Sequence, residues 1–194
     1  MLPFLLYIIE EKLTIVYHGT SMSRYSKILK EGFIRPRYND NGNWHTKMDG
    51  NENLVYLSAD KTGAMFHSFR SNIVNNDKMG VVLPIDLDAL DESNLRVDEN
   101  YIDTIERGQY SNCPFSVRAI QREKALDDKR WKESLDTVKM MAFYGKIDTI
   151  FIVNPIFVKV KENPWYREHL FISTPKQNML AFDHHLATHY TETW

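Results

Sequence analysis

The segment Leu13-Thr14-Ile15-Val16-Tyr17-His18-Gly19-Thr20-Ser21 decides how the 194-residue chain can be interpreted. Its first five residues are mostly β-branched or aromatic, which is typical of a buried strand. Four small or polar residues, His18 to Ser21, then follow without a break. We therefore predict a strand that ends at Tyr17 and an elbow formed by His18-Gly19-Thr20.

The residues after this elbow have the pattern of a short helix. Ser21 is a typical N-cap, and Tyr25, Ile28 and Leu29 fall on one helical face. Gly32 is suited to the left-handed conformation that ends many helices. We predict a helix of about three turns between the two.

A second strand, turn and helix follow the loop at residues 35 to 53. That loop is rich in Asn, Asp and Gly and contains Trp44 and His45. The strand is predicted at Leu54-Val55-Tyr56-Leu57-Ser58, with Asp60 or Thr62 as the cap of the next helix. The apolar residues of this helix are Ala64, Met65, Phe66 and Phe69.

Further elements are predicted beyond residue 80. A strand over residues 80 to 87 contains Pro84, which places it at a sheet edge or a bulge. Residues 91 to 114 are polar and predict no regular element. One or two helices are expected within residues 117 to 139, and two short strands, 141 to 144 and 147 to 153, join through Gly145-Lys146 in a hairpin or a bend.

Composition indicates one domain and excludes several classes of protein. The chain is 43% hydrophobic, and its 24 basic and 26 acidic residues leave a net charge of −2, so there is no strong charge signature for nucleic acid. One cysteine, Cys113, excludes an intrachain disulfide and a cysteine-based zinc site. The apolar run Met1–Ile9 is shorter than the roughly 20 residues of a membrane span and lacks signal-peptide flanks. We expect a cytoplasmic protein.

Two motifs together resemble the ADP-ribosyltransferase superfamily, which includes poly(ADP-ribose) polymerases, DarT-like toxins and RNA 2′-phosphotransferases. The first is Val-Tyr-His-Gly-Thr-Ser, residues 16 to 21. The second is Val-Tyr-Leu-Ser-Ala-Asp, residues 55 to 60, followed by Gly63-Ala64-Met65-Phe66. The resemblance covers about residues 13 to 153, which leaves 154 to 194 as a C-terminal extension of a single domain.

The resemblance implies an α+β fold with two small packed sheets, mixed or antiparallel, that form a split β core flanked by helices. It also implies NAD as the substrate. His18 would bond the nicotinamide ribose, and the backbone of Gly19 would hold the carboxamide, because glycine permits close approach. Tyr56 or Phe66 would stack on the ring. Thr20 and Ser58 complete the expected NAD-binding set.

An acid that such transferases use is missing from its expected place. Where the resemblance puts a glutamate, at the start of the last motif strand, this chain has Met140 or Met141. Glu133 and Asp136 are the nearest acids and are our candidate catalytic residues alongside His18. The phosphotransferase relatives use basic residues instead, and we consider Arg118 and Arg122 for that role.

Each candidate also has a structural interpretation. His18 could cap the following helix from the core, Gly19 could be a turn residue, and Tyr56 and Phe66 could serve packing alone. Glu133 and Asp136 lie in a charged segment where solvated carboxylates are common. The alternatives to a transferase are therefore a catalytically degenerate module that binds a nucleotide or a partner, and an RNA 2′-phosphotransferase-like enzyme.

The histidines near the C-terminus suggest a third class of protein. Asp183-His184-His185 and His189 have helix-compatible spacing, and His169 could add a ligand for a metal-dependent phosphoesterase. Surface histidines explain them more simply, so we predict no metal. The acceptor of a transfer reaction, whether protein, nucleic acid or small molecule, is not specified by the sequence.

Overall fold

The computed structural model describes residues 14–36, 53–106, 123–160 and 190–193. The helices and strands in chain order are β1 (Ile15–Ser21), α1 (Met22–Glu31), β2 (Phe33–Ile34), β3 (Leu54–Ser58), α2 (Lys61–Asn75), β4 (Met79–Asp86), β5 (Leu95–Val97), α3 (Glu99–Ile105), α5 (Trp131–Val138), β6 (Met140–Tyr144), β7 (Ile147–Asp148), β8 (Ile156–Val160) and β9 (Tyr190–Thr193), with short 3-10 helices η1 (Glu92–Asn94) and η2 (Thr149–Phe151). The loop containing Trp44 and His45, and the residues Arg118, Arg122, His169, Asp183, His184, His185 and His189, lie outside the described residues.

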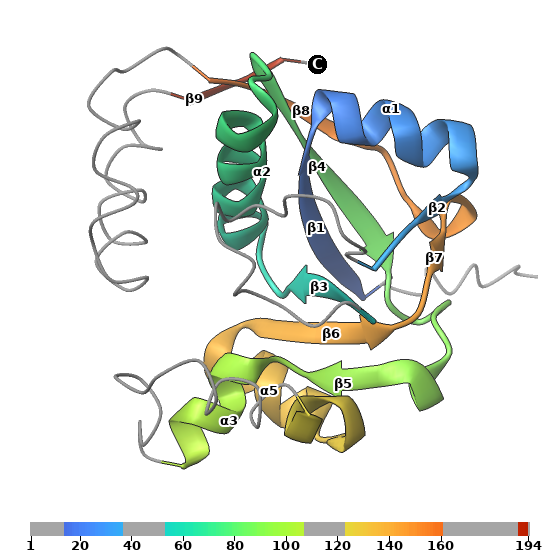
Figure 1. Cartoon of the computed structure of the whole chain (residues 1–194), viewed down its shortest axis with the longest axis vertical. Helices are drawn as coiled ribbons and strands as arrows, with labels where there is room; N and C mark the ends of the chain where they lie inside the picture. The colour runs from blue at the N-terminus through green and yellow to red at the C-terminus, as the bar shows by residue number, and fades with distance from the viewer. Residues whose placement is uncertain (1–13, 37–52, 107–122, 161–189, 194) are drawn as a thin grey trace, which may run out of the picture.

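Seven strands form one sheet in the order β5-β6-β3-β1-β4-β8-β9 (Figure 1). All six neighbouring pairs in it are antiparallel. A separate two-stranded sheet joins β2 and β7. The α+β prediction with an antiparallel sheet is confirmed, but the prediction of two small, mixed or antiparallel sheets was wrong in its proportions. Which strands pair over long sequence distances is set by packing, which local patterns do not report.

The large sheet is nevertheless divided by how its central strand pairs. All seven residues of β1 pair with β4, but only Tyr17 pairs with β3, through Ser58. On the far side, β3 pairs with β6 along all five of its residues. In Figure 1, β1 and β4 accordingly run at a steep angle to β3, β6 and β5. We call the gap between β1 and β3 beyond this one pair the split.

Helices cover the β1–β4 half on both faces. Val16, Leu83 and Ile85 share an apolar core with Tyr25 and Ile28 of α1. On the opposite face, Val82 and Tyr17 pack with the apolar side of α2. Side chains alternate between the faces of a strand, so the half lies between α1 and α2, as Figure 1 shows.

The β3–β6–β5 half uses the same core as α1 on one of its faces. Leu57, Met141 and Leu95 belong to the core that contains the α1 residues, and Trp131 and Leu135 of α5 pack against it. The alternate residues of these strands face the other way. One apolar layer therefore runs across the split and joins the two halves.

The predicted end of the first strand was wrong. Strand β1 continues through His18, Gly19, Thr20 and Ser21, each paired with a residue of β4. The polar residues are tolerated in a strand because α2 supplies hydrogen bonds: Ser68 Oγ donates to Thr20 O over 2.9 Å, and Ser21 N donates to Ser71 Oγ over 3.1 Å.

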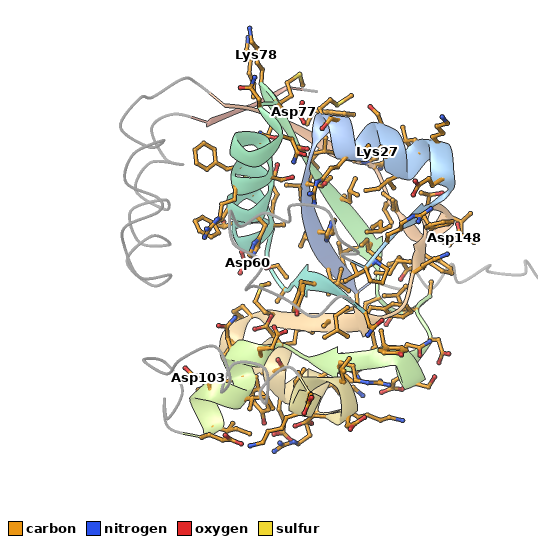
Figure 2. All side chains as sticks on the ribbon, in the orientation of Figure 1. Lys27, Asp60, Asp77, Lys78, Asp103 and Asp148 are labelled. Atoms are coloured by element: carbon orange, nitrogen blue, oxygen red, sulfur yellow. The ribbon has the colours of Figure 1, made fainter. Side chains whose placement is uncertain are left out.

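The helix predicted after Ser21 is confirmed as α1, and Gly32 ends it with a φ of 82°. Tyr25 and Ile28 are buried as expected, but Leu29 is 57% exposed, so its assignment to the apolar face was wrong. Asp60 is the residue that caps α2, because its side chain accepts a hydrogen bond from Gly63 N at 2.7 Å. Figure 2 shows Asp60 at this end of α2 and Asp77 beyond the other end.

Strand β4 corrects the prediction for Pro84, since the strand lies inside the sheet, between β1 and β8. The proline fits because β8 pairs only with Met79 to Val82. The ladder between β4 and β8 therefore does not reach Pro84. There, Pro84 O instead accepts a hydrogen bond from Val153 N at 2.8 Å. The same pairing puts β8, assigned by sequence to an extension, into the main sheet.

Strand β5 and helix α3 lie in a segment where the sequence predicted no element. Their junction is held by Ser134 of α5, which is fully buried. Asp98 N donates to Ser134 Oγ at 3.0 Å, and Ser134 Oγ donates to Met140 O at 2.7 Å. One hydroxyl thus connects the end of β5 to the start of β6.

Replacement of Ser134 by alanine is expected to destabilise the fold by about 1–3 kcal/mol, because it leaves the buried N–H of Asp98 without its partner and removes the bond to Met140 O. The measurement is urea unfolding followed by circular dichroism. Ser26→Ala is the matched control, since Ser26 is exposed on α1 and surface substitutions usually change stability by less than about 0.5 kcal/mol. Equal unfolding midpoints for both variants would show that the two hydrogen bonds of the Ser134 hydroxyl do not stabilise the fold.

Candidate functional site

The split is where the sequence-predicted residues of the two motifs meet. Strands that diverge leave backbone N–H and C=O groups without ladder partners, and such groups must be satisfied in another way. His18 does this for one of them, since its Nδ1 lies 3.0 Å from the carbonyl oxygen of Tyr56. The structure therefore brings His18 of the first motif and Tyr56 of the second into direct contact.

The contact defines the state of the His18 ring. A carbonyl oxygen can only accept, so Nδ1 carries the hydrogen, and in the neutral ring Nε2 is then an acceptor. Burial lowers the pKa of His18, and the nearby charge of Arg24 lowers it further, against the opposing effect of the bond to Tyr56. A neutral His18 thus has one nitrogen fixed on the protein and the other available to accept a hydroxyl hydrogen.

A second histidine lies near the first, on α2. The pKa of His67 is lowered to about 4 by burial, by Arg70 and by His18. The nearby charge on His18 comes from Arg24 of α1, and His18 in turn acts on His67 of α2. The His18 ring lies in the split, where the charge of Arg24 acts on it, while Arg70 acts on His67.

Gly19 has a packing role that the sequence did not suggest. A Cβ at this position would lie 1.8 Å from the carbonyl oxygen of Ala64 and 2.7 Å from the nitrogen of Ser68. Only glycine allows α2 to approach β1 this closely. Thr20 is 3% exposed next to it, so its side chain is enclosed by protein.

The other predicted NAD-binding residues differ in their surroundings. Phe66 is 4% exposed and packs in the core below α2, with the guanidinium carbon of Arg70 5.5 Å from its ring centre. Ser58 is also buried, and its Oγ accepts from Asp60 N at 3.3 Å and donates to Lys139 O at 3.4 Å. Tyr56 is half-buried and keeps a polar tip, which makes it the aromatic residue best placed for a ligand.

The two candidate acids lie on the other side of the sheet. Glu133 and Asp136 are exposed on α5, which packs on the Leu57 face, whereas the side chain of Tyr56 takes the opposite face. The carboxylate of Glu133 accepts a hydrogen bond from Tyr101 at 2.5 Å and raises the pKa of that phenol. The structure does not bring either acid together with His18.

Sequence reasoning missed an acid that does reach Tyr56. The hydroxyl of Tyr56 donates to Oε1 of Glu99, the first residue of α3. The available signal was the alternation Leu95-Arg96-Val97 followed by Asp98, which is a strand ending at an N-cap. Arg96 and Ala142 pair across the sheet, and Ala142 pairs in turn with Tyr56, so one row of residues crosses this face.

Comparison of the chain with protein-family models, with curated proteins and with solved structures found no match in any of the three. Within the described ranges, the side chains include no group of three or more His, Cys, Asp or Glu arranged to hold a metal ion. Nor does any helix in the described part of the chain have the length and apolar character to cross a membrane.

Gly19→Ala is expected to destabilise the protein by about 1–3 kcal/mol or more, because the new methyl group would overlap the backbone of α2. Urea unfolding measures the change, and calorimetric titration with NAD measures binding on the same samples. A variant with unchanged stability and lost NAD binding would show that the glycine serves the ligand and not the helix.

The lowered pKa of His67 predicts that the folded protein loses stability in mild acid. The unfolded chain takes up a proton below about pH 6.5, whereas the folded chain does so only near pH 4, so stability is fully present above 6.5 and falls as the pH drops toward 4. His67→Gln removes this contribution, and its unfolding midpoint should fall less steeply across that window. Parallel curves for the two proteins would disprove the shifted pKa.

Proposed function

We propose that the chain binds NAD in the split and transfers ADP-ribose from it to an acceptor, as the resemblance to ADP-ribosyltransferases implies. The observation that carries the proposal is the contact between the two motifs, His18 Nδ1 to Tyr56 O at 3.0 Å, at the place where β1 and β3 separate.

The chemistry of NAD suits these groups. Diverging strands supply backbone donors and acceptors for the carboxamide of nicotinamide, and Nε2 of His18 can accept a ribose hydroxyl. Tyr56 offers a ring to stack on the nicotinamide, a role for which the buried Phe66 is less suited. The charge of Arg24 near His18 favours the pyrophosphate.

A second candidate is a module that binds the nucleotide without chemistry. It is favoured by β6, where Met140 and Ala142 are on the Tyr56 side and supply no carboxylate. The charge of Arg24 near His18 also suits a phosphotransferase acting on an RNA 2′-phosphate. Release of nicotinamide therefore separates the transferase from the module.

The test is incubation of the purified chain with NAD, followed by chromatographic measurement of nicotinamide. Wild type is expected to release it, and His18→Ala is expected to lower kcat/KM by about 10²-fold, since a misplaced substrate loses rate on this scale. Lys27→Ala is the control, because Lys27 projects from the exposed side of α1 (Figure 2).

Calorimetric titration with NAD completes the assignment. Binding without release would overturn the transferase and support the module. Neither binding nor release with protein, nucleic acid and small acceptors present would overturn both, and equal loss in His18→Ala and Lys27→Ala would remove His18 from the site.

A further inference from the structure

We propose that the surface where the end of α1 meets η2 binds to an anionic membrane. This surface, which we call the α1–η2 surface, consists of Leu29, Lys30, Phe33, Arg35, Lys146 and Ile150. It includes no residue of either motif, so the inference stands independently of the proposed NAD function.

Hydrogen bonds hold the two parts of the α1–η2 surface together. Thr149 donates to Gly32 O twice, from its backbone nitrogen at 2.9 Å and from its Oγ1 at 3.0 Å. Gly32 ends α1 and Thr149 begins η2, so Leu29 and Ile150 lie on either side of this contact. Strands β2 and β7 pair beside the same end of α1 (Figure 1). Segments more than a hundred residues apart in the chain therefore form one surface.

Two large aliphatic side chains project from this surface. Leu29 is 57% exposed and Ile150 is 78% exposed, which makes them the most exposed large hydrophobic residues in the described part of the chain. A single exposed apolar residue is ordinary, but these two come from different elements and flank one contact. A side chain with so little protein around it has no pocket wall beside it to hold a partner's side chain. The interface of a bilayer needs no pocket, because lipid surrounds whatever is inserted.

Cationic side chains accompany the apolar ones. Lys30 is exposed next to Leu29 on α1. The Nζ of Lys146 lies 4.3 Å from the ring centre of Phe33, and the guanidinium carbon of Arg35 lies 5.2 Å from it. Lysine and arginine can lay their stems along apolar surface while their charged ends stay in water. The same arrangement lets them meet lipid headgroups around an inserted aliphatic side chain.

The acids of this surface are bonded to groups of the protein. Within residues 28–36 and 146–151, Glu31 pairs with Arg35 at 2.7 Å, and Asp148 accepts from Ile150 N at 3.0 Å. These ranges hold three cations and two acids, a formal charge of +1, whereas the whole chain carries −2. The local charge thus has the sign that an anionic leaflet attracts, although the chain as a whole does not.

The test is sedimentation of the full chain with phospholipid vesicles. We expect at least about tenfold more binding to vesicles that mix phosphatidylserine with phosphatidylcholine than to phosphatidylcholine alone. Binding should weaken when the salt concentration rises from about 0.1 M to about 1 M, because the screening length falls from about 10 Å to about 3 Å.

Two variants separate the apolar and the charged contributions. Ile150→Ser is expected to lower the vesicle partition coefficient about tenfold, since it removes apolar area that would enter the bilayer. The double variant Lys30→Glu with Lys146→Glu is expected to lower it at least about tenfold. Ile105→Ser is the apolar control, because Ile105 is 41% exposed on α3. Lys78→Glu is the charge control, since Lys78 is exposed beyond the end of α2 (Figure 2).

Each outcome decides for or against the membrane. Loss of binding in Ile150→Ser and in the double lysine variant, with both controls unchanged, supports it. No sedimentation with phosphatidylserine, equal binding to phosphatidylcholine alone, or equal losses in the controls overturns it. Binding to soluble poly-glutamate as tight as to the anionic vesicles, and unaffected by Ile150→Ser, would assign the surface to an acidic protein segment and overturn it as well.

Discussion

The close approach of α2 to the centre of the sheet is the constraint on which the remaining structure depends. At Gly19 there is no space for even one carbon atom between the strand and the carbonyl oxygen of Ala64. At this distance the serines of α2 reach the strand: Ser68 bonds Thr20 O, and Ser71 bonds Ser21 N. The helix is thereby fixed over β1 and β4, and His67 is placed near the split.

Local patterns predicted the elements next to this constraint. Strand β3 lies where its β-branched and aromatic residues indicated, α1 ends at a left-handed Gly32, and the apolar residues of α2 are buried. The elbow was predicted wrongly because His18 to Ser21 are polar or small, and a strand of such residues becomes stable only when a helix contacts it. Pairing partners such as β4 and β8 are also decided at long range.

The candidate site was predictable only in part for the same reason. The resemblance identified His18 and Tyr56, and the structure brings them into contact. The resemblance could not identify Glu99 as the partner of Tyr56, because Glu99 lies in a polar segment for which the sequence predicts no regular structure. Glu133 was chosen by its distance along the chain from Met140, but the alternation of strand faces separates it from Tyr56 in space.

The division of the sheet has a mechanical consequence. Its two halves are joined by one residue pair, by the hydrogen bond between His18 Nδ1 and Tyr56 O, and by an apolar layer that includes Val16 and Leu57. Hydrogen bonds depend steeply on angle, whereas apolar contact depends on buried area and hardly on direction. The apolar layer therefore resists separation of the halves more than it resists a small change in the angle between them.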